Sequence, residues 1–347
     1  MKILSIDIEK WRNLEKVNIN VPEEESLICL VGENGTGKSN ILELLSYACA
    51  ELGLSSGYDL PRGNPSKDVH DFSLKIKLSP SIVNEVTKYF SEIYKNEGYV
   101  TEAQNWDGTL KFISANKENY QKEIIAGGNL EVIDKAAFGN EIKKVLRKIK
   151  EIYLVYLDSD RAYPPIKFDS RQIVEAEKKE FENWEWKNNW AYRPTRTLYE
   201  EWIKYFLAKE RQVSTTHIKK IRKSQKQGKK APNFKDPFES YTNSLQEILP
   251  HLEFSGIDDN ENTISFDSSG TSLKFWQLSS GEKEISFLVG QIERFQLRKG
   301  IFLLDEPELH LNSDLVRLWV SYLQNTIDEG QVWLATHSLE AVEVAGN

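Results

Sequence analysis

The segment GENGTGKS, residues 32–39, constrains this chain more than any other feature of its sequence. It follows a continuous apolar run at residues 27–31 and precedes NILELLSYACAELG, whose apolar residues recur at helical spacing until Gly53. A glycine-rich loop between a buried strand and a helix presents backbone N–H groups and the positive end of the helix dipole to an anion. The spacing G-x-x-x-x-G-K-[ST] in this context therefore predicts a phosphate-binding loop in an α/β domain, rather than a turn that only caps a helix.

The predicted ligand of this loop is ATP with Mg²⁺. We expect the Lys38 ammonium to contact the β- and γ-phosphates and so to take part in catalysis, and the Ser39 hydroxyl to bind Mg²⁺. The other expected nucleotide contacts come from the loop and the first helical turn: Gly32, Glu33, Asn34, Gly35, Thr36, Gly37 and Asn40.

An acidic pair follows a second buried run near the end of the sequence. Residues 301–311, IFLLDEPELHL, begin with four apolar residues that lead directly to Asp305 and Glu306. A buried parallel strand carries its carboxyl end toward the ligand crevice, so Asp305 is expected in the Mg²⁺ shell. Glu306 is then placed to polarise the attacking water as a catalytic general base. A strand followed by an acidic helix cap is the alternative interpretation.

Two further segments are weaker indications of phosphate binding. The segment LSSGE, residues 278–282, precedes a predicted helix at residues 280–297, where Ser279 and the backbone amide of Gly281 are candidates to bind a phosphate. A plain helix cap with an acidic first turn explains the same residues. His337, in ATHS, follows a predicted strand and is a candidate catalytic contact to the γ-phosphate, although a lone histidine is more often a packing or surface residue.

Taken in order, GENGTGKS, LSSGE, LLDEPELHL and ATHS resemble the head of an ABC-type ATPase. The group most similar contains RecF, SMC-like proteins and the overcoming-lysogenization-defect (OLD) ATPases. Residues 8–14, IEKWRNL, resemble the N-F-R-N-F/L start of that group, and DEPELHL is similar to the Walker B segment of OLD-type bacterial defence ATPases. The resemblance covers roughly residues 1–80 and 250–347.

This resemblance implies hydrolysis of ATP with Mg²⁺ by a homodimer or higher oligomer, in which two heads sandwich two ATPs. It implies that Ser279 and Gly281 complete the site of the partner subunit, that His337 senses the γ-phosphate, and that Arg12 reaches the nucleotide phosphates. The group also has a glutamine loop after the strand expected at residues 152–157. Residues 158–161, DSDR, stand there instead, so Arg161 is expected to contact the nucleotide or the other head.

The alternation of strand and helix patterns at both ends predicts a P-loop ABC-type α/β fold with a mixed sheet core and a mainly helical insertion. Residues 1–159 and 250–347 are assigned to the two parts of the ATPase head, and residues 160–249 to a helical, basic insertion or arm. Strands are expected near residues 3–8, 17–21, 27–31, 72–78, 110–114, 152–157, 252–254, 263–267, 273–276, 301–304 and 332–335, and a further helix near residues 141–150.

Two stretches of the insertion have unusual composition. Residues 211–235 hold nine Lys or Arg and no acidic residue; removing these charges from a formal net charge of −8 leaves −17 for the rest of the chain. The segment suits docking on a phosphate backbone, a solvated loop or an acidic protein partner. Upstream aromatic residues favour a packing core or a protein interface over stacking on single-stranded bases: Trp184, Trp186, Trp190, Tyr192, Tyr199, Trp202, Tyr205 and Phe206.

Bulk properties favour the cytoplasm. Charge interrupts the first residues too early for a signal peptide, and no apolar run approaches the length of a membrane span. The two cysteines, Cys29 and Cys49, form neither a disulfide framework nor a zinc pattern. Nothing resembles a nuclease site, and the chain ends ten residues after His337. It is therefore expected to be either an excised part of a longer protein or an ATPase that acts with a separate effector.

The leading hypothesis is a cytoplasmic ATPase of the OLD/RecF-like group. In it, ATP closes a dimer, hydrolysis reopens it, and the insertion transmits the change to DNA or to an effector; anti-phage defence is implied by the resemblance alone. A RecF-like DNA repair or maintenance ATPase is one alternative, and a slowly hydrolysing, ATP-bound scaffold for a partner protein is another. The absent glutamine loop and DEPELHL disfavour a transporter subunit.

Overall fold

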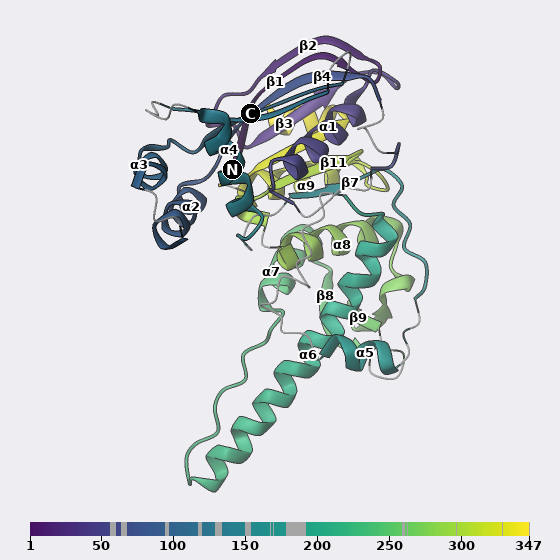
Figure 1. Cartoon of the computed structure of the whole chain (residues 1–347). Helices are drawn as coiled ribbons and strands as arrows, with labels where there is room; N and C mark the ends of the chain where they lie inside the picture. The colour runs from purple at the N-terminus through teal and green to yellow at the C-terminus, as the bar shows by residue number, and fades with distance from the viewer. Residues whose placement is uncertain are drawn as a thin grey trace.

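The chain folds around a four-stranded parallel sheet in the order β3-β12-β11-β7 (Figure 1). The computed structural model describes residues 1–55, 60–63, 68–93, 97–116, 120–128, 134–149, 154–166, 168, 170–177, 192–258, 261, 263–295, 297–327 and 329–346. The four strands come from both ends of the sequence: β3 (Leu27–Val31), β7 (Leu154–Leu157), β11 (Ile301–Asp305) and β12 (Gln331–Thr336).

The parallel sheet is covered on both faces, which explains the uninterrupted apolar runs of its strands. Side chains alternate between two hydrophobic cores along β11. Leu303 packs in the first core, whereas Phe302 and Leu304 pack in the second. Because alternate side chains serve different cores, neither face of this strand can be polar.

The first core lies between the parallel sheet and a five-stranded antiparallel sheet, β2-β1-β4-β5-β6. Figure 1 shows α1 (Lys38–Glu51) between the two sheets, and every residue from Asn40 to Ala50 is buried. A helix enclosed in this way is expected to be apolar on all sides. The antiparallel strands are β1 (Lys2–Trp11), β2 (Leu14–Asn20), β4 (His70–Lys77), β5 (Thr109–Asn116) and β6 (Tyr120–Ala126).

The second core fills the other face of the parallel sheet. Its helices are α6 (Thr195–Lys226), α7 (Glu239–Ile248), α8 (Ser280–Phe295) and α9 (Ser313–Thr326). The three-stranded sheet β10-β9-β8 contributes to the same core, with β8 (Leu252–Asp258), β9 (Thr263–Ser268) and β10 (Thr271–Lys274). Helices α6 and α8 approach closely because Gly290 has no side chain; a Cβ there would lie 2.2 Å from the indole nitrogen of Trp202.

Shorter elements surround these layers. Figure 1 shows α2 (Pro80–Ile93), α3 (Glu97–Asn105) and α4 (Lys135–Leu146) together at one side of the antiparallel sheet. Helix α5 (Ser170–Glu177) packs on α6, and α10 (Leu339–Ala345) packs on α9 and β3. Two 3₁₀ turns, η2 (Phe275–Gln277) and η3 (Leu297–Lys299), flank α8 in the sequence.

One long helix leaves the body of the molecule. The buried residues of α6 end at Ala208, and the rest of the helix projects away before residues 227–236 return to the body (Figure 1). We call residues 211–235 the arm. No described helix is both long and apolar enough to cross a membrane.

The predicted fold class, a mixed α/β P-loop ATPase fold, is confirmed. Strand β6 and helices α2 and α3 were not predicted. The helix expected at residues 141–150 starts earlier, at Lys135, and ends at Leu146; residue 150 lies outside the described residues, as do residues 152 and 153 of the strand expected at 152–157. The division at residues 159 and 249 stays a prediction. Among the described residues of the expected insertion, α6 and α7 share the second core with α8 and α9, and the arm projects from it.

The aromatic segment of the expected insertion packs inside the protein where it is described. Tyr199, Trp202 and Phe206 are almost fully buried in the second core, and Tyr192 is buried beside β7. Tyr205 is partly buried against the same core. The expected packing role is confirmed for these residues, while Trp184, Trp186 and Trp190 lie outside the described residues.

Candidate nucleotide-binding site

A cavity of about 320 Å³ opens at the carboxyl ends of the parallel strands. Loops that follow β3, β7, β11 and β12 meet there, as parallel topology requires. The cavity is lined by Asn13, Asn34, Gly35, Gly37, Lys38, Ser39, Asn40, Arg62, Ser159, Asp305, Glu306 and His337. Most of the predicted nucleotide, metal and catalytic residues therefore lie around one space, although they come from distant parts of the sequence.

The phosphate loop needs its glycines for backbone geometry. Gly35 and Gly37 have φ of 81° and 104°, in the left-handed region that side chains disfavour. A Cβ on Gly37 would also lie 2.5 Å from a methyl carbon of Leu14. Within the loop, the Thr36 hydroxyl donates to the carbonyl of Glu33 at 2.9 Å. These constraints hold the loop open at the start of α1, where its N–H groups can face an anion.

Lys38 and His337 meet at the mouth of the loop. The Lys38 ammonium donates to the carbonyls of Gly32 and Glu33 at 2.8 and 3.0 Å, and its Nζ lies 3.0 Å from Nε2 of His337. An ammonium only donates, so Nε2 of His337 accepts in this contact. The two residues expected to contact the γ-phosphate thus occupy one corner of the cavity.

Asp305 and Ser39 form the part of the cavity that suits Mg²⁺. Asp305 is only 6% exposed; burial raises the pKa of its carboxyl, and a hydrogen bond from the Ser39 hydroxyl opposes that rise. A carboxylate and a hydroxyl beside a phosphate loop are the oxygen ligands that Mg²⁺ takes alongside phosphate oxygens and water. The residues present therefore fit Mg²⁺ with ATP.

Glu306 is held in an unusual backbone conformation. Its φ is 51°, which disfavours residues with a side chain by roughly 1 kcal/mol or more. The conformation is fixed by a hydrogen bond from the Glu306 amide to the carbonyl of Ala335 at 2.8 Å. The half-buried Glu306 side chain lines the cavity next to Asp305. A carboxylate in this place is suited to accept a proton from water at the phosphate.

Arg161 holds the backbone of this acidic pair in place. Its side chain is fully buried and forms an ion pair with Glu284 of α8 at 2.5 Å. The guanidinium also donates to the carbonyls of Asp158, Asp305 and Glu306, each at 2.6 Å. The expectation that Arg161 contacts the nucleotide or the other head is wrong for this structure. The side chain faces inward because the backbone carbonyls after β7 and β11 and the Glu284 carboxylate supply its partners.

The tip of the β1–β2 hairpin braces the phosphate loop. The Trp11 indole donates to the carbonyl of Asn40, and the Asn13 amide donates to the carbonyl of Gly35, both at 2.8 Å. Arg12 forms an ion pair with the buried Glu43 of α1. It does not line the cavity, so a contact from Arg12 to the phosphates stays a prediction.

The signature segment lies outside this cavity. Ser279 and Glu282 form a reciprocal cap on α8: the Ser279 amide donates to the Glu282 carboxylate at 2.7 Å, and the Glu282 amide donates to the Ser279 hydroxyl at 3.3 Å. Ser279 is exposed, whereas Gly281 is buried, and a Cβ on it would lie 3.0 Å from the carbonyl of His310. Neither residue lines the cavity of its own chain. Their contact with a partner's nucleotide stays a prediction.

Residues 27–343 match the family model described as "AAA domain, putative AbiEii toxin, Type IV TA system". The chain belongs to this family of AAA domains. The match spans both the phosphate loop and the acidic strand, which are the two parts of a P-loop ATPase that hold nucleotide and metal. No curated protein matches the chain.

Three solved structures are similar to this chain at low sequence identity, and one of them, with a TM-score above 0.5, shows the same fold. An SMC head bound to the C-winged helix domain of ScpA aligns with a TM-score of 0.51 and 13% identity, covering 99% of this chain and 92% of that chain. The SMC head domain from Thermotoga maritima aligns with a TM-score of 0.47 and 12% identity, covering 99% of this chain and 92% of that chain. The third structure is the Smc head domain with an extended coiled coil bound to the C-terminal domain of ScpA, derived from Pyrococcus furiosus. It aligns with a TM-score of 0.49 and 14% identity, covering 99% of this chain and 91% of that chain.

Several residues of the site had not been predicted from the sequence. Asn13, Arg62 and Ser159 line the cavity. Ser159 is the second residue after the end of β7, so its position after a core strand was a usable signal, whereas no local pattern marks Arg62. Glu308 was also missed. Its carboxylate accepts from the Thr336 hydroxyl at 2.8 Å and from the His337 amide at 2.7 Å, and so fixes the loop that carries His337.

Proposed function

We propose that this AAA domain binds ATP with Mg²⁺ and hydrolyses it at a composite site made by two copies arranged head to tail. The observation that carries the proposal is the shared cavity of Lys38, Ser39, Asp305, Glu306 and His337. These residues supply a phosphate cation, two metal ligands, a general base and a γ-phosphate contact within one space.

Each residue has a distinct role in this proposal. The loop N–H groups and Lys38 bind the β- and γ-phosphates, and Ser39 and Asp305 hold Mg²⁺, which withdraws negative charge from the phosphates when bound. Glu306 accepts a proton from the attacking water. His337 contacts the γ-phosphate, and Glu308 keeps it in place through the His337 amide.

The second copy enters through the signature segment. Ser279 is exposed at the start of α8 and faces no phosphate of its own chain, since it does not line the cavity. A helix N-terminus favours an anion through its backbone N–H groups and its dipole, and the resemblance to ABC-type heads implies this use of the segment. We therefore assign Ser279 and the amide of Gly281 to the γ-phosphate bound by the partner.

The loop after β7 offers a route from this site to the arm. Ser159 lines the cavity, and its neighbour Asp158 accepts hydrogen bonds from the hydroxyls of Tyr192 and Thr195. Thr195 is the first residue of α6, the helix that extends into the arm. A shift of the loop on nucleotide binding would therefore act on the base of the arm.

The biological setting follows from resemblance. DEPELHL and the IEKWRNL start support a cytoplasmic ATPase of the OLD/RecF-like group that controls DNA engagement or an associated effector in anti-phage defence. A plating assay tests this: cells that carry the intact gene with its neighbours should resist phage, and a Lys38→Ala variant should not. Equal plating of phage on both strains contradicts the setting.

The test of the activity itself is Glu306→Gln. Removal of the general base should lower the turnover of ATP by about 10²–10⁴-fold while ATP binding is retained. The variant should then accumulate as an ATP-bound dimer. Glu253→Gln, at an exposed position of β8, is the matched control and should keep wild-type turnover. Unchanged turnover in Glu306→Gln would remove this residue from the proposed mechanism.

A further inference from the structure

The arm is a projecting helix with no core of its own. From Lys209 to Lys226, α6 would extend roughly 25 Å at 1.5 Å per residue, and none of its residues in this stretch is buried. A mostly polar helix without a buried residue gains little from packing. Such a surface is suited to contact something outside the chain.

The charge of the arm selects the chemistry of that contact. All nine of its Lys and Arg residues are exposed except Arg211, which is partly buried, and the segment holds no carboxylate. The rest of the chain carries a formal charge of −17. Like charges this dense repel each other along one helix and loop, and a polyanion relieves that repulsion.

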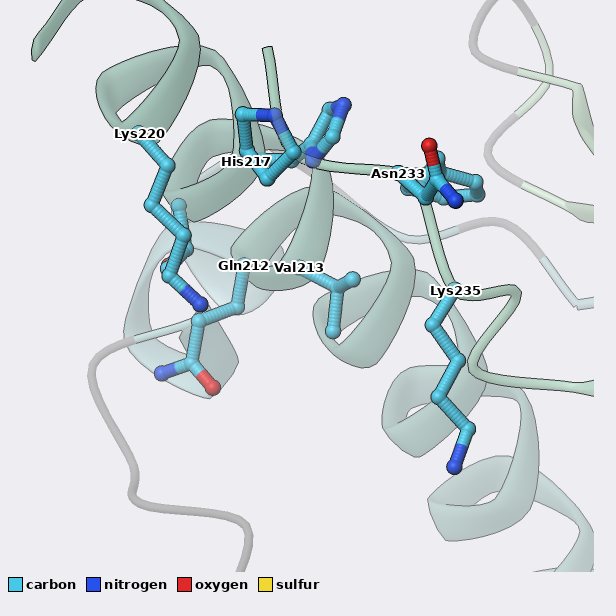
Figure 2. A pocket seen from close by; sticks show the side chains of 9 residues that line it. Gln212, Val213, His217, Lys220, Asn233 and Lys235 are labelled. Carbon is cyan, nitrogen blue, oxygen red and sulfur yellow. The ribbon is translucent and has the colours of Figure 1, made fainter. Parts of the chain in front are cut away.

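A groove of about 260 Å³ lies between α6 and the returning segment. It is lined by Gln212, His217, Lys220, Asn233, Phe234 and Lys235 together with smaller neighbours, and none of the described residues that line it is acidic. Figure 2 shows Lys220 and Lys235 on opposite sides of the view, with His217 and Asn233 between them. The groove is thus flanked by cations and contains amide groups.

An aromatic ring is exposed in the same groove. The Phe234 side chain is 52% exposed, and its ring centroid lies 5.2 Å from that of His217 in an edge-to-face arrangement. Exposed phenylalanine beside lysines has a specific use, because a nucleobase can stack on the ring while the adjacent phosphates contact the ammonium groups. The bases of a duplex are already stacked inside the helix and must be unstacked before one can reach the ring, whereas the bases of a single strand are free to do so.

We propose that this groove binds a single-stranded nucleic acid segment. Lys220 and Lys235 contact successive phosphates, one base stacks on Phe234, and the amides of Gln212 and Asn233 lie within the same groove for hydrogen bonds to the base or sugar. A peptide whose side chains are all acidic would use the two lysines but leave the exposed ring without a counterpart. The inference goes beyond ATP hydrolysis and does not depend on it.

The test measures the binding of a fluorescent oligonucleotide of about 16 nucleotides by anisotropy, at several salt concentrations. Lys220→Glu with Lys235→Glu should weaken binding at least about tenfold and reduce the salt slope by roughly 1.4, since each phosphate contact on a single strand contributes about 0.7. Lys75→Glu with Lys111→Glu, on the paired strands β4 and β5, makes the same change of net charge and should leave binding nearly unchanged.

Substitutions of Phe234 separate stacking from charge. Phe234→Leu should weaken binding of the single strand about 5- to 150-fold, the range of 1–3 kcal/mol for one stacked base, while Phe234→Tyr should retain it. Both variants should keep wild-type ATP binding, because the arm lies outside both cores.

Three results would overturn the proposal. Equal weakening by the Lys75/Lys111 pair would show binding by net charge alone. Wild-type affinity in Phe234→Leu would show that no base stacks on the ring. Polyglutamate and the unlabelled strand can be compared as competitors at the same charge concentration. If polyglutamate competes as effectively as the strand, the groove is assigned to an acidic protein partner.

Discussion

The nucleotide cavity and the arm are built on opposite principles. Polar groups at the cavity form ion pairs and hydrogen bonds between distant segments, as Arg161 does with Glu284 and with the carbonyls of Asp305 and Glu306. In the arm, cationic side chains stand exposed along one helix and a short return segment. The first region has its geometry fixed before a ligand arrives, which catalysis requires, whereas the second offers charge that any suitable polyanion can use.

The largest expected change in stability comes from breaking the buried ion pair between Arg161 and Glu284. Arg161→Met would leave the Glu284 carboxylate without its cation in the interior, and the free energy of unfolding should fall by about 3–5 kcal/mol. Urea denaturation measures this change. The double variant Arg161→Met with Glu284→Met should recover part of the loss, since no charge is then left unpaired. If the single variant is as stable as the wild type, the cavity does not depend on this ion pair.

Lys38→Ala tests the cavity as a ligand site. Loss of a charged hydrogen-bond donor to phosphate should weaken ATP binding by roughly 10- to 150-fold, equivalent to 1.5–3 kcal/mol. Titration of a fluorescent ATP analogue gives the affinity. Lys88→Ala, an exposed lysine on α2, serves as the control. Wild-type affinity in Lys38→Ala would contradict the assignment of the phosphate loop.

The buried carboxyl of Asp305 predicts a pH dependence. Burial raises its pKa in the folded chain, so the folded state holds this proton more tightly than the unfolded state. The resulting loss of stability is absent below the unfolded-state pKa of about 3.9 and develops as pH rises from there through the raised folded-state pKa. At pH 7 without nucleotide, Asp305→Asn should therefore melt at a higher temperature than the wild type.

The same variant should lose the additional stabilisation that ATP with Mg²⁺ gives the wild type, because the metal ligand is gone. Thermal melts at pH 4 and pH 7, with and without ATP and Mg²⁺, separate the two effects. A lower melting temperature for Asp305→Asn at pH 7 without nucleotide would contradict the described burial of this carboxyl.

The smallest effect is expected in the arm. Lys223→Ala removes an exposed side chain that lies outside both cores, so the free energy of unfolding should change by less than about 0.5 kcal/mol. Urea denaturation beside Arg161→Met gives the comparison directly. A loss of about 2 kcal/mol or more would mean that the arm is part of the packed structure.

Features that depend on one continuous segment could be predicted from the sequence. The phosphate loop follows from GENGTGKS because its glycines, lysine and serine act through their own backbone and neighbours. The central strands follow from apolar runs, because a parallel sheet covered on both faces leaves no polar position. Strand β6, with the sequence YQKEIIA, was missed because its pairing with β5, rather than its own pattern, makes it a strand.

Contacts between distant residues could not be predicted in the same way. Arg161 looked like a substitute for a glutamine loop, and only the folded chain shows that Glu284 of α8 lies beside it. Glu308 and Asn13 also act on residues far away in the sequence, His337 and Gly35 respectively. Their side chains carry no local pattern that names a partner, so the residues that support the site had to come from the structure.

Each catalytic site is proposed to need two chains, and a mixing experiment tests this requirement. Lys38→Ala disables the phosphate loop of one chain, and Ser279→Arg blocks the signature of the other, so each variant alone should be inactive as an ATPase. Mixed, they should regain turnover, because the dimer then contains one site with an intact loop and an intact signature. A mixture of Lys38→Ala with Glu306→Gln should stay inactive, since each cavity then lacks one of its own groups. Wild-type turnover by Ser279→Arg alone, or no recovery in the first mixture, would contradict a site shared by two chains.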